Sequence, residues 1–95
     1  MSYAVYILYS KRMDRFYIGQ TKDLNDRIAL HLEKAFKGSF TSKANDWELF
    51  QTISCESSFQ AIRIESHIKK MKSRQYIQNI KEYPEISDKL KNKYH

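Results

Sequence analysis

The fold of this chain is decided by YAVYILY at Tyr3–Tyr9 and, a few residues later, FYIGQT at Phe16–Thr21. Both stretches are rich in aromatic and β-branched residues, which favour extended backbone. The link between them, Ser10–Arg15 (SKRMDR), is polar and short, so the two strands are expected to pair antiparallel as a hairpin. Trp47–Cys55 (WELFQTISC) predicts a third strand.

Helical spacing marks two of the segments that follow the hairpin. Asp23 is suited to cap a helix over about residues 23–36, where leucine and isoleucine recur every four residues. Ser57 or Ser58 can cap a second helix that runs to Met71. The apolar residues of this second helix are Phe59, Ala61, Ile62, Ile64, Ile68 and Met71.

Ser73 can cap a third helix, Arg74 to about Glu82, which Pro84 ends. The order strand, strand, helix, strand, helix, helix predicts an α+β domain: a small three-stranded antiparallel or mixed sheet flanked by helices. Residues 1–83 are assigned to this domain, and residues 84–95 are expected to form a loosely held charged tail.

The balance of charges in this 95-residue chain is basic, with 17 lysines and arginines against 11 acidic residues and a net charge of +6. Such a balance favours polyanions, of which nucleic acid is the commonest, although a merely solvated basic surface gives the same count. Cys55 is the only cysteine, which excludes an intramolecular disulfide and a cysteine-based zinc site. With no signal peptide and no membrane-length apolar run, the chain is expected to be cytoplasmic.

Glu65 is the most informative single acid. Residues of a helix lie about 100° apart around its axis, which places Glu65 at the edge of the apolar stripe formed by Ala61, Ile64 and Ile68. A carboxylate against a core needs a cation, hydrogen bonds or a metal ion. On the pattern alone, an ion pair with Lys69 four residues later is the favoured interpretation.

Two groups of cations could meet phosphate. Arg27, His31 and Lys34 follow one flank of the first predicted helix, and a guanidinium can bind phosphate bidentately. A solvated polar flank is the commoner explanation of this spacing. The second group, at the end of the second predicted helix, could contact phosphates or complement the helix C-terminus; it consists of Lys69, Lys70, Lys72 and Arg74.

Among the tyrosines of the hairpin, Tyr6 and Tyr17 lie in different strands. Tyr17 is expected to share a face with Gly19. A glycine inside a strand is unfavourable, and it often marks the close approach of a ligand or of another backbone. On spacing alone, the tyrosines are explained as ordinary aromatic residues of a sheet.

Taken together, these residues resemble the signature of the GIY-YIG nuclease superfamily. Ala4–Tyr6 stands where the family has Gly-Ile-Tyr, with alanine replacing the glycine, and Tyr17–Gly19 matches its Tyr-Ile-Gly strand. Arg27 and His31 match the arginine and histidine of the next helix, and Glu65 matches the metal-binding glutamate of a later helix. Further similarity to the small stand-alone bacterial members is found at Thr41, Lys43 and Trp47–Leu49.

The resemblance implies a metal-dependent DNA endonuclease. Glu65 would hold one Mg²⁺ or Mn²⁺, and Arg27 would stabilise charge that develops on the phosphate. A tyrosine would help to activate the attacking water, with Tyr6 favoured and Tyr17 as its partner, while His31 would position or assist.

The resemblance further implies a substrate among DNA forms that include branched or flapped structures, and a role in repair or recombination. A protein partner is compatible with it. The cations expected to contact nucleic acid are Lys22, Lys34, Lys43, Lys69, Lys70, Lys72 and Arg74. Two alternatives stay open at this point: a non-catalytic nucleic-acid-binding module, and an accessory protein of a larger partner.

Overall fold

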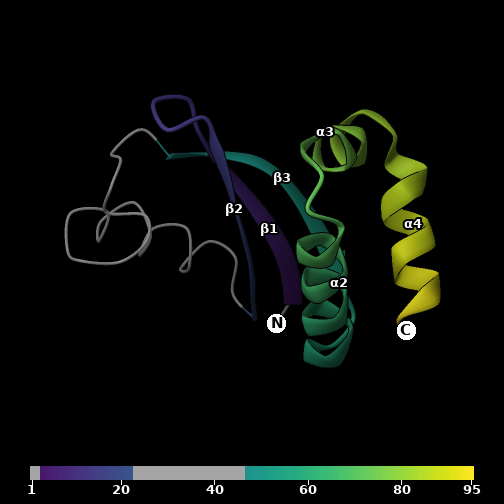
Figure 1. Cartoon of the computed structure of the whole chain (residues 1–95). Coiled ribbons are helices and arrows are strands. Elements are labelled where there is room, and N and C mark those ends of the chain that lie inside the picture. Colours follow the sequence, from purple (N-terminus) through teal and green to yellow (C-terminus); the bar gives the residue numbers. More distant parts are fainter. Residues whose placement is uncertain (1–2, 23–46) are drawn as a thin grey trace.

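The computed structural model describes residues 3–22 and 47–95, which form three strands and three helices (Figure 1). The strands are β1 (Tyr3–Ser10), β2 (Arg15–Thr21) and β3 (Trp47–Cys55), and the helices are α2 (Ser58–Met71), α3 (Arg74–Glu82) and α4 (Pro84–Lys93). None of these helices is long and apolar enough to cross a membrane.

The three strands form one antiparallel sheet in the order β2-β1-β3, so β1 is central and β2 lies at an edge. Tyr6 pairs with Gly19 on β2 and with Thr52 on β3. The α+β class, the β1–β2 hairpin and the third strand are confirmed. The helix expected over about residues 23–36 lies outside the described residues.

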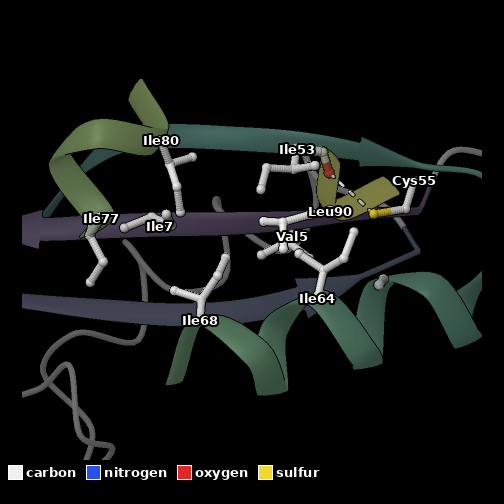
Figure 2. Packing of buried hydrophobic residues seen from close by; sticks show 10 residues of the cluster. Val5, Ile7, Ile53, Cys55, Ile64, Ile68, Ile77, Ile80 and Leu90 are labelled. Carbon is white, nitrogen blue, oxygen red and sulfur yellow. Dashed lines mark hydrogen bonds between the residues drawn. The ribbon is translucent and has the colours of Figure 1, made fainter. Parts of the chain in front are cut away.

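The side chains of β1 alternate between two apolar clusters, as the pleat of a strand requires. Val5 and Ile7 point to the face that α2, α3 and α4 cover (Figures 1 and 2). Tyr6 and Leu8 belong to a second cluster with Trp47 on the opposite face. The helix-covered face holds the larger core, which consists of Val5, Ile7, Ile53, Cys55, Ala61, Ile64, Ile68, Ile77, Ile80 and Leu90.

Cys55 lies in this core, and its thiol donates a hydrogen bond to the carbonyl of Ile53 at 3.5 Å (Figure 2). Burial raises the pKa of the Cys55 thiol. A buried, protonated thiol is a poor nucleophile, so Cys55 has a structural role in the core.

Serine side chains begin two of the helices, as their positions in the sequence predicted. The Oγ of Ser57 accepts a hydrogen bond from the amide of Gln60 at 3.1 Å, and the Oγ of Ser73 does the same for Tyr76 at 3.1 Å. Each hydroxyl thereby satisfies an amide that a helix N-terminus leaves without a backbone partner. Lys72 ends α2 in the left-handed conformation, with φ 48°.

The segment after Tyr83 differs from the expected charged tail, because it forms helix α4. Pro84 stands at the start of this helix, where its fixed φ and missing N–H are tolerated. Leu90 is only 4% exposed and belongs to the core. The buried amide of Gln60 on α2 donates to the carbonyl of Lys91 at 3.1 Å, which fastens α4 to the rest of the domain.

Candidate active site

Tyr6 and Tyr17 lie next to each other on the face of the sheet that α2 does not cover. Their ring centroids are 6.4 Å apart. Tyr6, in the central strand, is only 1% exposed, whereas Tyr17, in the edge strand, is half-buried. The ring of Trp47 meets Tyr17 edge-on at 6.4 Å. Tyr17 is therefore the tyrosine that a solvent-borne substrate can reach.

Gly19 makes room for Tyr6. A Cβ at position 19 would overlap the Tyr6 hydroxyl and lie 2.5 Å from Cζ of the same ring. The close approach expected at this glycine is thus made by a side chain of the neighbouring strand rather than by a ligand or a backbone.

Glu65 lies on one flank of α2, one turn before Lys69. The two side chains form the predicted ion pair, with 3.6 Å between Lys69 Nζ and Glu65 Oε1. The Glu65 side chain is 20% exposed and that of Lys69 is 55% exposed, so the pair is open to solvent. An ion pair of this length and exposure is weak, and a stronger cation could replace Lys69 at the carboxylate.

This flank of α2 faces the outer edge of β2. A cavity of about 380 Å³ lies between the two elements and is lined by Phe16, Tyr17, Ile18 and Lys69. Tyr17 and Lys69 therefore share one cavity, although the first comes from the sheet and the second from a helix. Since Glu65 pairs with Lys69, the cavity brings the half-buried Tyr17 and the acidic residue to one edge of the described part of the chain.

A second cavity, of about 540 Å³, extends toward the turn of the hairpin and the junction between α2 and α3. Here Arg74 and Asp14 form an ion pair, with 2.9 Å between Nη1 and Oδ2, and a second guanidinium nitrogen donates to the Asp14 carbonyl. The hydroxyl of Tyr9 donates to the other carboxylate oxygen at 2.6 Å. The hydrogen bonds from Arg74 and Tyr9 lower the pKa of Asp14.

This pair was not anticipated from the sequence, because its partners are 60 positions apart. Arg74 was expected to contact nucleic acid, and part of its hydrogen-bonding capacity is used by Asp14 instead. The sequence does indicate the turn position of Asp14, because aspartate tolerates the positive φ of 52° that it adopts in the hairpin turn.

The other predicted contacts with nucleic acid are distributed unevenly. Lys69 and Lys72 line the larger cavity, whereas Lys22 and Lys70 are exposed and outside the residues that line either cavity. Four predicted site residues lie outside the described part of the chain: Arg27, His31, Lys34 and Lys43.

The donor set at this edge suits a hard cation that is held mainly by its substrate. Within residues 3–22 and 47–95, no group of three or more histidine, cysteine or acidic side chains could hold a metal ion. Mg²⁺ is commonly bound by one or two carboxylates together with water and substrate phosphates. Glu65, as a single accessible carboxylate beside the cavity, fits that pattern.

A comparison with known families gives one match. The family model of the GIY-YIG catalytic domain matches residues 2–80, which include both tyrosine strands, Gly19 and Glu65. No curated protein and no solved structure matches the chain. Because the match spans most of the 95 residues, the chain belongs to the GIY-YIG catalytic domain family, a family of nucleases that generally use divalent metal ions.

Proposed function

We propose that the protein is a metal-dependent endonuclease that hydrolyses phosphodiester bonds of DNA during repair or recombination. The observation that carries the proposal is the cavity at the edge of β2, which Tyr17 and Lys69 share and beside which Glu65 lies. The net charge of +6 supports a polyanionic substrate.

Glu65 is the residue proposed to hold Mg²⁺ or Mn²⁺. When bound, such an ion stabilises negative charge on the scissile phosphate and on the leaving oxygen. Lys69 neutralises the carboxylate in the free protein, and its long side chain can turn toward a phosphate when the substrate arrives. Arg27 is assigned to the stabilisation of phosphate charge, and His31 to positioning.

The geometry favours Tyr17 over Tyr6 as the group that activates the attacking water. A general base must come within hydrogen-bond reach of the proton that it removes, and Tyr17 lines the cavity while Tyr6 is buried. We therefore reverse the sequence-based preference for Tyr6. In this proposal Tyr6 is the positioning residue, packed behind Tyr17 and over Gly19.

Cleavage of labelled DNA tests the proposal. The substrates are an intact duplex, a flap and a branched junction, each with Mg²⁺ or Mn²⁺. Cleavage by the parent protein is expected to fall by at least about 100-fold in Glu65→Gln and in Tyr17→Phe, the scale seen when one charge-stabilising group is removed. Glu85→Gln, which changes an exposed acid on α4, is the matched control and should cut normally.

Binding measured in parallel separates the alternatives. Retained binding with lost cleavage in Glu65→Gln would support a catalytic carboxylate. A parent protein that binds DNA in a salt-sensitive manner but cuts none of the substrates would contradict the proposal and favour a non-catalytic binding module. Cleavage that survives in Glu65→Gln would remove Glu65 from the proposed site.

A further inference from the structure

We propose that the larger cavity is a binding site for an unpaired DNA strand. This junction groove lies between the hairpin turn with β2 and the α2–α3 junction, has a volume of about 540 Å³, and is lined by Asp14, Arg15, Phe16, Ile18, Ile68, Lys69, Lys72, Ser73, Arg74 and Ile77. The inference deepens the proposed nuclease function and rests on it, because it names the form of DNA that this site would receive.

The junction groove combines an apolar floor with a cationic rim. Side chains of Phe16, Ile18, Ile68 and Ile77 supply the apolar surface. The exposed cations Arg15, Lys69 and Lys72 surround it. Asp14 is the only acid among the described residues that line the groove, and Arg74 neutralises it. The charge of the rim therefore favours an anion over the whole length of the groove.

An unpaired strand matches both surfaces, whereas a duplex matches only one. A duplex keeps its bases stacked inside the double helix and presents mainly its phosphates to a protein that does not enter a groove of the DNA. It would therefore contact the cationic rim of the junction groove but not its apolar floor. An unpaired nucleotide also exposes the face of its base, which binds to apolar and aromatic surfaces and to guanidinium planes. Arg74, whose guanidinium carbon lies 5.7 Å from the centre of the Phe16 ring, adds such a plane beside the floor.

The junction groove is continuous with the candidate active site. Phe16, Ile18 and Lys69 line both cavities, and Tyr17 lines the smaller one. A strand that lies in the groove would thus lead past Lys69 to Tyr17 and Glu65. The preferred substrate would carry an unpaired segment next to the bond that is cut.

Two substitutions test the groove without touching the proposed catalytic residues. Lys72→Gly removes a rim cation at a position with φ 48°, a conformation that glycine adopts freely, so the variant should fold. Arg15→Gln removes a second exposed rim cation at the start of β2. Lys89→Gln, which removes an exposed cation on α4, is the matched control.

Binding is measured by fluorescence anisotropy in EDTA, so that cleavage cannot interfere. The probes are a blunt duplex, the same duplex with a single-stranded extension, and that duplex with an extension of abasic residues. The parent should bind the normal extension about tenfold more tightly than the abasic one. Each rim substitution should weaken binding of the extended duplex and lower the slope of log affinity against log salt by about 0.7.

The blunt duplex should be bound with nearly the same affinity by the parent and both rim variants, and Lys89→Gln should leave all binding unchanged. Equal losses for blunt and extended duplexes, or no loss at all, would overturn the assignment of the groove to an unpaired strand. If the rim variants bind and cut as the parent does, the groove assignment fails and the nuclease function stands. If the binding results are as expected but no DNA is cut, the nuclease function fails and the groove assignment stands.

Discussion

The side chain of Tyr6 fills the space that any residue other than glycine would need at position 19. Because Tyr6 and Gly19 are directly opposite each other in the β1–β2 ladder, the tyrosine ring can lie flat across the neighbouring strand. This packing holds Tyr6 beside Tyr17, a residue that lines the cavity at the edge of the sheet. Gly19 thereby helps to place the half-buried Tyr17.

Gly19→Ala is expected to lower the free energy of unfolding by about 1–3 kcal/mol, the usual cost of overpacking. The added Cβ would lie 2.5 Å from Tyr6 Cζ, and the ring is buried and cannot move aside. Urea denaturation measures the change. Tyr6→Phe removes the hydroxyl that the Cβ would overlap, so the double variant should lose less than the sum of the single variants. Additive losses would contradict a direct clash.

At the scale of single residues, the sequence predicted the Glu65–Lys69 ion pair but not the burial of Tyr6. Tyr6, Tyr17, Gly19 and Glu65 could be selected from their positions, and the Glu65–Lys69 ion pair followed from helical spacing. The burial of Tyr6 could not be read in advance, because Tyr6 and Tyr17 both lie in short apolar stretches and are each followed by an isoleucine. Which of them faces solvent depends on β1 being central and β2 being the edge strand.

Helix α2 connects the core to the candidate active site, and its two ends are defined by different chemistry. Ser57 caps its first turn through a side-chain hydrogen bond. Its last turn closes at Lys72, which adopts the left-handed conformation that usually belongs to glycine. The serine was readable from the sequence as a start signal, whereas the lysine gave no sign that a helix ends there.

Lys72→Gly is expected to leave the free energy of unfolding unchanged or to raise it by up to about 1 kcal/mol, since glycine adopts positive φ without strain. The same substitution at Lys70, inside the last turn of α2, should lower it by about 1 kcal/mol. Chemical denaturation of both variants gives the comparison. A loss at both positions would show that the conformation of Lys72 carries no strain.

His67 joins α2 to the end of the chain, with its Nδ1 2.9 Å from the hydroxyl of Tyr94. Burial, and then the charges of Lys93 and Lys70, lower the pKa of His67 below its usual 6.5. As the pH falls, His67 is therefore protonated in the unfolded chain before it is protonated in the folded protein. Stability from this group is present above pH 6.5 and is lost as the pH falls through the folded pKa.

Thermal unfolding between about pH 7 and pH 5 should therefore show a decline in Tm that is steeper for the parent than for His67→Gln. The glutamine keeps a hydrogen-bonding group near Tyr94 but does not titrate. Parallel profiles for the two proteins would mean that His67 does not couple protonation to folding.

At the scale of the molecule, residues 3–22 and 47–95 form one sheet with three helices on one face (Figure 1), and α4 completes the core of that face. The sequence suggested a tail here because six of the residues from 84 to 95 are charged or histidine, in a short run that begins with a proline. A helix is indicated here by Ile86 and Leu90, which are apolar and four residues apart. They follow a proline at a position that helices accept. Tertiary burial of those two side chains, rather than local preference, accounts for the helix.

Leu90→Ala is expected to lower the free energy of unfolding by about 2–5 kcal/mol, the range for truncating a buried leucine. Leu90 packs with the core residues of the sheet (Figure 2). Lys89→Ala, at the exposed neighbouring position, should change it by less than about 0.5 kcal/mol. Urea denaturation of both variants measures the two changes. If residues 84–95 were a loosely held tail, neither substitution would change the free energy of unfolding.

The Asp14–Arg74 pair was the long-range feature that no local pattern could supply, and it also limits how this protein can vary in length. Turns of hairpins at the surface ordinarily accept inserted residues, because few contacts depend on them. Here the turn is held to the start of α3 by two hydrogen bonds from one guanidinium. An insertion between Lys11 and Asp14 would move the carboxylate away from Arg74 and change the width of the junction groove. The length of this turn is therefore constrained by a contact with a residue 60 positions away along the chain.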